Sequence, residues 1–364
     1  MRVVHVAECV GGVERYLRSL LKYSSCENIM ILSQLYNKAE FENLADSVEI
    51  VSMSHNIGIS ALKEAMQIRK KIKKYKPDIV YAHSSIAGAI TRMACVGVKT
   101  KVIYNPHGWS FNMESDKKNI FIVLEKVMSR FCDKIICISD AEKESALKYK
   151  ICKKSKLCVI YNGIDVDEYK PEKANLPVSD DMFVVGMVGR ICKQKAPDVF
   201  LKMAGEVKKK IPNSCFVIVG DVIEGEEQER KDIEELAKKM DVNLIITGWV
   251  DNPLEYMNRF DVGCLLSRWE GFGLVIPEYM LTRTPIVATR VDAIPYLITD
   301  GVDGLLVDKD DWKAASDMIL KIYYNNELKT KLLENERNKV YKEFDIKRVI
   351  EECEKMYGEL VNEM

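Results

Sequence analysis

The sequence predicts an α/β protein with two domains, each built on a parallel sheet. Its 364 residues are too many for one ordinary hydrophobic core. Short β-type runs alternate with helical patterns along the chain, which is typical of βαβ units. The runs form two series. We therefore expect two Rossmann-like domains, with strands at 2–7, 28–33, 48–53, 78–83, 101–107 and 134–139 in the first, and at 183–189, 215–220, 243–248, 262–267 and 285–289 in the second, followed by a short segment at 304–308.

A proline-punctuated loop, KPEKANLPVSDD at 170–181, separates the two series and is interpreted as the interdomain linker. A final helix, from about Ile346 to Asn362, has no strand after it, and we expect it to cross back to the first domain. The predicted division is a first domain at 1–170, a second at 171–345 and the returning helix at 346–364.

Helix 61–75 illustrates the pattern between the strands, because apolar residues recur at helical spacing opposite a row of lysines. The apolar face is expected to contain Leu62, Ala65, Met66, Ile68 and Ile72.

The composition is that of a globular protein, with 47% hydrophobic and 30% charged residues. No stretch approaches the ~20 apolar residues that a membrane-spanning helix needs. The N-terminus lacks the basic leader and apolar run of a secretory signal. The eleven cysteines are scattered without metal-binding spacing, which favours reduced thiols in a cytoplasmic protein.

Charge is distributed unevenly along the chain. Residues 1–170 contain 27 basic and 19 acidic side chains, whereas 171–364 contain 27 basic and 36 acidic ones. The basic half is expected to meet something anionic, although ordinary solvated helix faces would give the same pattern. Its run RKKIKKYK (69–76) could lie on an anionic membrane, which would make the protein peripheral on the inner face of the cell membrane.

The stretch SRWEGFGLVIPEYM (267–280) has the features of a ligand site at the carboxyl end of a strand. Its carboxylates, Glu270 and Glu278, can accept hydrogen bonds from neighbouring sugar hydroxyls. The glycines at 271 and 273 allow close approach of the backbone. A helix expected to start near Pro277 could hold phosphate at its free N–H groups.

EGFGLVIPE resembles the E-x7-E element of retaining glycosyltransferases of the GT-B fold, family 4. Other segments resemble the same family in order and spacing: GGVERYL (11–17), DIVYAHSS (78–85), the segment ending in His107-Gly108, ISDAEKES (138–145), YNGID (161–165) and VGRICKQKA (188–196). The resemblance implies two Rossmann-like domains that face each other across a cleft, the first binding the acceptor and the second the nucleotide-sugar.

The resemblance also implies roles in donor binding. Arg190 and Lys195 would bind the diphosphate and offset the charge that develops on the leaving group. Glu278 would hold the ribose hydroxyls, and Glu270 would contact the transferred sugar. The remaining donor-binding residues would be Gly271, Phe272, Gly273 and Leu274.

In the first domain, the resemblance implies that Gly12 lets its loop close over the donor and that His107 lies near the reacting sugar. The implied catalytic set is His107, Arg190, Lys195 and Glu270. Ordinary structural roles stay open as alternatives: a turn for Gly12, a hydrogen-bonded strand end for His107 and surface charges for the others. His5 and His83 are expected to be structural, and His55 lies in no motif.

One position departs from the family pattern, because Ala196 follows Lys195 where glycine is usual. If this position requires positive φ, alanine costs roughly 1 kcal/mol. The motif DVD (165–167) looks like a metal-binding DxD but is interpreted as structural, and no metal or other cofactor is expected.

Together these features predict a retaining glycosyltransferase that moves a sugar from a nucleotide-sugar to a glycan or lipid-linked acceptor in cell-surface polysaccharide synthesis. The expected donor is a UDP-sugar, the common donor in the family that the sequence resembles. No nucleic-acid partner is expected. Alternatives are a nucleotide-sugar epimerase of the same plan and a non-catalytic sugar-binding protein. A nicotinamide-dependent oxidoreductase is disfavoured because GGVERY lacks G-x-G-x-x-G spacing.

Overall fold

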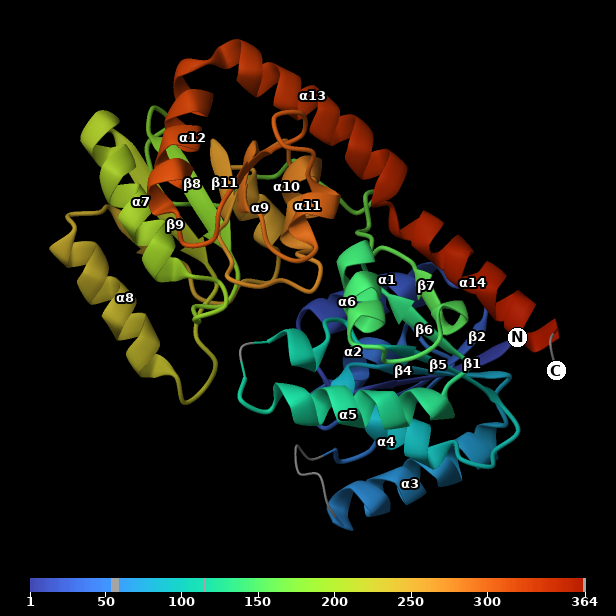
Figure 1. Cartoon of the computed structure of the whole chain (residues 1–364). Helices are drawn as coiled ribbons and strands as arrows, with labels where there is room; N and C mark the ends of the chain where they lie inside the picture. The colour runs from blue at the N-terminus through green and yellow to red at the C-terminus, as the bar shows by residue number, and fades with distance from the viewer. Residues whose placement is uncertain (54–58, 114, 363–364) are drawn as a thin grey trace. The chain divides into compact units, whose positions relative to one another are not determined.

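The computed structural model describes residues 1–53, 59–113 and 115–362. His55 therefore lies outside the described residues. The chain forms two compact units (Figure 1): unit 1 comprises Met1–Ile164 and Ile346–Met364, and unit 2 comprises Asp165–Asp345. Residues 165–170, which the sequence analysis assigned to the first domain, belong to unit 2.

Unit 1 is built on a sheet whose described strands are all parallel, in the order β3-β2-β1-β4-β5-β6-β7. The strands are β1 (Arg2–Ala7), β2 (Glu27–Leu32), β3 (Ser47–Ile50), β4 (Ile79–His83), β5 (Lys101–Asn105), β6 (Lys134–Cys137) and β7 (Leu157–Val159). The helices are α1 (Gly12–Tyr23), α2 (Lys38–Glu42), α3 (Ile59–Tyr75), α4 (Ser85–Ala94), α5 (Lys118–Met128), α6 (Asp140–Lys148) and α14 (Ile346–Asn362). Strand β7 was not predicted from the sequence.

Unit 2 repeats the plan with its described strands in the order β10-β9-β8-β11-β12-β13, again all parallel. The strands are β8 (Phe183–Val188), β9 (Ser214–Val219), β10 (Leu244–Ile246), β11 (Val262–Leu265), β12 (Ile286–Thr289) and β13 (Leu305–Val307). The helices are α7 (Pro197–Lys210), α8 (Glu227–Lys239), α9 (Pro253–Met257), α10 (Val275–Leu281), α11 (Ile294–Leu297), α12 (Trp312–Tyr324) and α13 (Asn326–Glu343).

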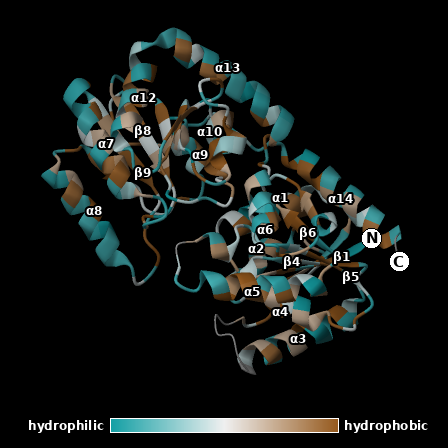
Figure 2. Cartoon of the chain, viewed as in Figure 1, coloured by the Kyte–Doolittle hydropathy of each residue, from teal (hydrophilic) through white to brown (hydrophobic). Residues whose placement is uncertain are grey.

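Apolar runs become strands because helices cover both faces of each sheet and leave few positions for polar side chains. Every residue of β4 and β9 is buried. By contrast, α8 is mostly hydrophilic (Figure 2), and only Ile233 and Ala237 are buried on it. Among the described residues, no helix combines the length and apolar character needed to cross a bilayer.

The predicted apolar face of α3 is partly wrong. Ala65, Ile68 and Ile72 are buried as expected, but Leu62 and Met66 are 58% and 62% exposed. The buried stripe begins at Ala61 instead, and Leu62 and Met66 each lie one residue, about 100°, further round the helix.

Helix α14 completes the core of unit 1. Its buried side chains recur every three or four residues, as on an amphipathic helix that covers a sheet. They share a hydrophobic cluster with Tyr16 and Leu17 of α1 and with Tyr81 of β4. The buried residues of α14 are Ile346, Val349, Ile350, Cys353, Met356, Tyr357 and Leu360.

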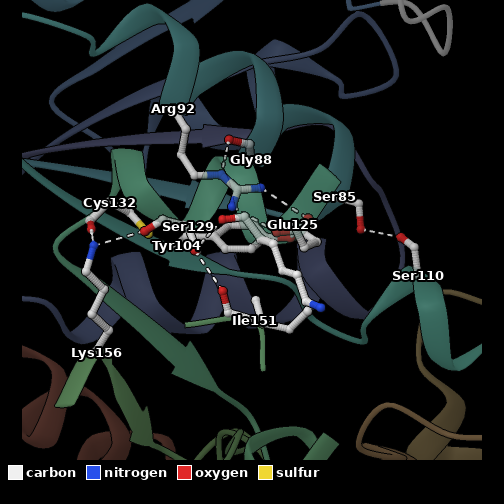
Figure 3. A network of polar contacts seen from close by, with 11 residues as sticks. Ser85, Gly88, Arg92, Tyr104, Ser110, Glu125, Ser129, Cys132, Ile151 and Lys156 are labelled. Carbon is white, nitrogen blue, oxygen red and sulfur yellow. Dashed lines mark hydrogen bonds and ion pairs between the residues drawn. The ribbon is translucent and has the colours of Figure 1, made fainter. Parts of the chain in front are cut away.

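A buried ion pair joins α4 to α5 (Figure 3). Arg92 is fully buried and donates to both carboxylate oxygens of Glu125, at 2.8 and 3.1 Å. Its Nε donates to the carbonyl of Gly88, and its guanidinium lies 3.8 Å from the ring centroid of Tyr104. The Tyr104 hydroxyl also donates to Glu125, at 3.1 Å. These contacts hold the inner side of α5 against the sheet.

Candidate functional site

Each sheet has a point at which the strand order reverses, and ligands of open α/β sheets bind beyond the carboxyl ends of the strands there. In unit 1 this switch point lies between β1 and β4, and in unit 2 between β8 and β11. Predicted site residues occur near both.

In unit 2, the loop after β11 brings Glu270 into a network of polar contacts. Glu270 is 7% exposed, and its carboxylate forms an ion pair with the Lys195 ammonium. The Ser267 hydroxyl donates to the same carboxylate oxygen at 2.8 Å. The Glu270 backbone N–H donates to Asp292 Oδ2 at 2.8 Å. Lys195 and Glu270, which are 75 residues apart in the sequence, thus form a charged pair at the switch point.

Glycines after the strands shape the loop that presents Lys195. Gly189 follows β8 with φ of 148°, and a Cβ on it would lie only 3.3 Å from the Lys195 side chain. Gly220 follows β9, and a Cβ there would lie 2.2 Å from the carbonyl oxygen of Gly189. The two glycines therefore allow the neighbouring backbones and the lysine stem to pack closely.

Ala196 adopts the left-handed conformation, with φ of 52° and ψ of 52°. Position 196 therefore requires positive φ, and the alanine there costs roughly 1 kcal/mol relative to an unstrained residue. Ala196 is fully buried and precedes Pro197, which is the first residue of α7.

Arg190 is exposed and makes no ion pair within the part of the chain that the structure describes. The structure therefore joins Lys195, but not Arg190, to Glu270. This leaves the Arg190 guanidinium accessible to an anion.

The segment after Glu270 leads into α10. The helix begins at Val275, earlier than the expected start near Pro277. Gly273 has φ of 85°, a conformation that favours glycine, and Phe272 is buried. Gly271 and Leu274 are partly buried, and Glu278 is buried on α10.

Sequence reasoning missed Asp292, which fixes the backbone of Glu270. It lies in the loop after β12, beside β11, and burial raises the pKa of its carboxyl group. An available signal was an aspartate soon after a buried strand, because the ends of parallel strands share one edge of the sheet. The segment at 247–249 follows β10, and Trp249 is 62% exposed.

In unit 1, the partly buried His107 is joined to a chain of buried polar side chains. His83 ends β4 and its Nδ1 lies 3.0 Å from His107 Nε2. His83 Nε2 lies 3.2 Å from His5 Nδ1 on β1, and His5 Nε2 lies 3.1 Å from Asn28 Oδ1 on β2. We expected structural roles for His5 and His83 from the sequence, but their connection to His107 was not predicted.

Burial disfavours the charged form of these imidazoles. It lowers the pKa of His5 to about 4 and that of His107 to about 3, and it takes the pKa of His83 well below its ordinary value. All three rings are therefore neutral near pH 7. His107 has φ of 51°, and its backbone N–H donates to Asn105 Oδ1 at 3.0 Å.

Two other predicted features lie on the surface of unit 1. Gly12 is exposed at the first position of α1, after Gly11 with φ of 78°. In the basic run at 69–76, Arg69 donates to two backbone carbonyls, and Lys71 and Lys74 form ion pairs with Glu49. Part of this charge is thus neutralised within unit 1.

The DVD motif at 165–167 closes a turn. Asp165 Oδ1 accepts hydrogen bonds from the backbone N–H groups of Asp167 and Glu168, at 3.1 and 3.2 Å. This arrangement is an Asx-type turn.

Comparison with known proteins gives matches over nearly the whole chain. The model of glycosyltransferase family 4 matches residues 10–168, and that of the glycosyl transferases group 1 matches residues 168–339. An uncharacterized 41.2 kDa protein in the cps region of Klebsiella pneumoniae is 32% identical, over 94% of this chain and 96% of the relative. The UDP-Gal:alpha-D-GlcNAc-diphosphoundecaprenol alpha-1,3-galactosyltransferase of Escherichia coli is 29% identical, over 87% of this chain and 86% of the relative.

Among solved structures, Anabaena Alr3699/HepE in complex with UDP and glucose aligns with a TM-score of 0.84 and 19% identity, over 98% of this chain and 99% of that one. This likeness, together with the two parallel-sheet units, defines a GT-B fold. The chain belongs to the family 4 (group 1) glycosyltransferases.

Proposed function

We propose that the protein transfers a sugar from a UDP-sugar to a hydroxyl group of a lipid-linked or oligosaccharide acceptor, with retention of anomeric configuration, in cell-surface polysaccharide synthesis. The observation that carries this proposal is the Lys195–Glu270 pair at the switch point between β8 and β11. It combines a cation suited to a diphosphate with a carboxylate suited to sugar hydroxyls.

In this proposal, Lys195 and Arg190 neutralise the diphosphate as its bond to the anomeric carbon breaks. Glu270, held by Ser267 and Asp292, accepts hydrogen bonds from the transferred sugar. The donor contacts are completed by Gly12, Gly271, Phe272, Gly273, Leu274 and Glu278.

The acceptor hydroxyl attacks the anomeric carbon from the face that the nucleotide leaves, and its proton passes to the departing phosphate oxygen. The bond from carbon to phosphate oxygen is thus replaced by a bond to the acceptor oxygen on the same face. The two cations provide the positive charge that a divalent metal supplies in other phosphate-leaving reactions, so we propose that no metal is required.

The nucleotide and the acceptor class are supported by the name of the Escherichia coli relative, which specifies UDP-Gal and a GlcNAc-diphosphoundecaprenol. A lipid-linked acceptor would be met at a membrane. We therefore propose that unit 1 contacts the anionic inner face of the cell membrane.

Helix α5 offers a more suitable surface for this contact than the partly neutralised run at 69–76. The inner side of α5 is held by the Arg92–Glu125 pair, whereas Ile120 and Val123 on its outer side are 62% and 61% exposed. Val127 and Phe131 continue the exposed apolar stripe. Exposed cations accompany the stripe, at Lys117, Lys126 and Arg130. Apolar side chains beside cations suit an anionic bilayer surface.

Cosedimentation with anionic vesicles distinguishes the two surfaces. Val123→Asp is expected to weaken binding, whereas Met66→Asp, at a similarly exposed apolar position on α3, is expected to leave it unchanged. The opposite result would favour α3, and binding that is indifferent to anionic lipid would contradict the membrane proposal.

The function is tested by incubating the protein with UDP-, GDP- and ADP-sugars and measuring release of nucleoside diphosphate, with and without a lipid-diphosphate-linked sugar and with and without EDTA. We expect release from a UDP-sugar that the acceptor raises, that EDTA does not abolish and that Glu270→Gln loses. NMR of the product should show a retained anomeric configuration. Interconversion of the sugar without release would indicate an epimerase, and nucleotide binding without turnover would indicate a non-catalytic protein.

A further inference from the structure

The polar chain from Asn28 to His107 has a direction, which its hydrogen bonds determine. A neutral imidazole has one N–H donor and one acceptor nitrogen. Each N···N contact in the chain must therefore pair a donor with an acceptor. Once the nitrogen that carries the proton is known in one ring, it is known in all three.

The direction is set at Asn28. Its Nδ2 donates to the backbone carbonyl of Cys26 at 2.9 Å. The opposite amide orientation would set two oxygen acceptors against each other, so the Cys26 carbonyl fixes Asn28 Oδ1 toward His5 Nε2, at 3.1 Å. An amide oxygen only accepts, and therefore His5 carries its proton on Nε2.

The assignment then passes from ring to ring. His5 Nδ1 has a lone pair and accepts from His83 Nε2–H, at 3.2 Å. His83 Nδ1 in turn accepts from His107 Nε2–H, at 3.0 Å. The centroids of the His83 and His107 rings are 5.3 Å apart, which fits rings that meet edge to edge along an N–H···N bond. His107 is consequently left with an unprotonated Nδ1, which makes no hydrogen bond to any other described residue.

We propose that Asn28, His5 and His83 are positioning residues that fix His107 as the Nε2–H tautomer, so that its Nδ1 accepts a hydrogen bond from a sugar hydroxyl. This inference rests on the proposed function, in which His107 lies near the reacting sugar. A neutral acceptor suits that place, because an imidazolium would add positive charge beside an anomeric carbon that becomes positive in the transition state.

The tautomers can be observed directly in the full-length protein, labelled with ¹⁵N at histidine. The chain has only four histidines, so their ring signals can be assigned with single variants. At pH 7 we expect His5, His83 and His107 each to carry one proton, on Nε2. A proton on Nδ1 of His107, or an imidazolium there, would overturn the assignment.

The role of Asn28 is tested by Asn28→Leu, two rings away from His107. Without the amide oxygen, His5 Nε2–H would be a buried donor with no acceptor, which costs more than leaving a lone pair beside leucine. We expect the chain to reverse, so that Nδ1 of His107 gains the proton. Ser33→Ala removes another buried hydrogen bond of unit 1, to the Glu8 carbonyl, and should leave the His107 signals unchanged. An unchanged His107 tautomer in Asn28→Leu would contradict the role of Asn28.

Activity and nucleotide binding separate this inference from the proposed function. In Asn28→Leu we expect kcat to fall about 100-fold, the lower range for loss of a preorganised hydrogen bond in a transition state. UDP affinity should stay the same, because the Lys195–Glu270 pair belongs to unit 2. A reversed tautomer with unchanged kcat would mean that no sugar hydroxyl uses the Nδ1 lone pair. Absence of transfer by the unaltered enzyme would contradict the proposed function, whereas the spectra test the tautomer by themselves.

Discussion

The switch points of the two units have the same topology but opposite chemistry. Beyond β8 and β11, unit 2 places the charged pair Lys195–Glu270. Beside β1 and β4, unit 1 places His5, His83 and His107, which burial keeps neutral. The topology thus determines where a site forms, and the few residues at the strand ends determine whether it presents charge or neutral hydrogen-bonding groups.

This difference corresponds to the two parts of the proposed reaction. A diphosphate requires fixed positive charge, and sugar hydroxyls require directed donors and acceptors.

The largest effect is expected from removing the charge in unit 2. Lys195→Met should lower kcat/KM about 1000-fold, because the leaving diphosphate loses a preorganised cation and Glu270 loses its partner. The measurement is release of nucleoside diphosphate from the best donor. Lys193→Met, an exposed lysine of the same loop, should change it less than about threefold, and similar losses in both variants would contradict a specific role for Lys195.

Unit 1 also buries charge, but away from its switch point, at the end of α4. Arg92→Met leaves the Glu125 carboxylate buried without its cation, which should destabilise unit 1 by about 3–5 kcal/mol. Arg92→Met with Glu125→Leu removes both charges and should recover most of that loss. Amide exchange of β4 and β5 reports the opening free energy of unit 1. Equal destabilisation in the single and double variants would show that packing, not charge, is responsible.

A smaller effect on the stability of unit 1 is expected at low pH. The folded-state pKa of His5, about 4, lies below its ordinary value of 6.5. The contribution of His5 to the free energy of unfolding is therefore complete above pH 6.5 and is lost as pH falls toward 4. At pH 5 the loss is about 2 kcal/mol for this ring. Burial raises the pKa of Glu142 to about 8, which works in the opposite direction as pH falls from 8 toward 4.5.

The effect of His5 is therefore measured as a difference. The opening free energy of unit 1, from amide exchange of β1 and β4, should fall by about 2 kcal/mol more between pH 7 and pH 5 in the unaltered protein than in His5→Gln. The amides of β8 and β9 provide an internal control in unit 2. Identical pH dependence in the two proteins would mean that His5 is not held neutral.

The smallest effect is expected at Ala196. Replacement by glycine relieves the left-handed strain, about 1 kcal/mol, but it removes a buried methyl group and adds freedom to the unfolded chain. Ala196→Gly should therefore change the stability of unit 2 by less than about 1 kcal/mol, as measured by amide exchange of β8. Ala196→Val should destabilise it clearly, because a β-branched residue tolerates positive φ poorly. Equal stability of the two variants would contradict this account.

The fold could be predicted well from the sequence, because buried parallel strands appear as apolar runs between helical patterns. The exceptions are strand β7, which was not predicted, and Leu62 and Met66, which lie one helical step from the buried face of α3. In unit 2, the Lys195–Glu270 pair joins two residues that the motifs had singled out.

The sequence could not reveal how the site residues are supported. Asp292 supports Glu270 from the adjacent strand end, and Asn28 supports His107 through two other rings. These connections depend on strand order and register, because β1 lies between β2 and β4. A spacing along the chain carries no information about such neighbours.

The return of α14 to unit 1 has a consequence for the order in which the protein is made. Unit 2 is one continuous segment, Asp165–Asp345, and is complete before the ribosome has synthesised α14. Until then, the cluster around Tyr16 and Tyr81 lacks the seven buried side chains that α14 contributes. The domain that begins first is therefore finished last, and a nascent chain that stops before Ile346 exposes an apolar surface to which chaperones can bind.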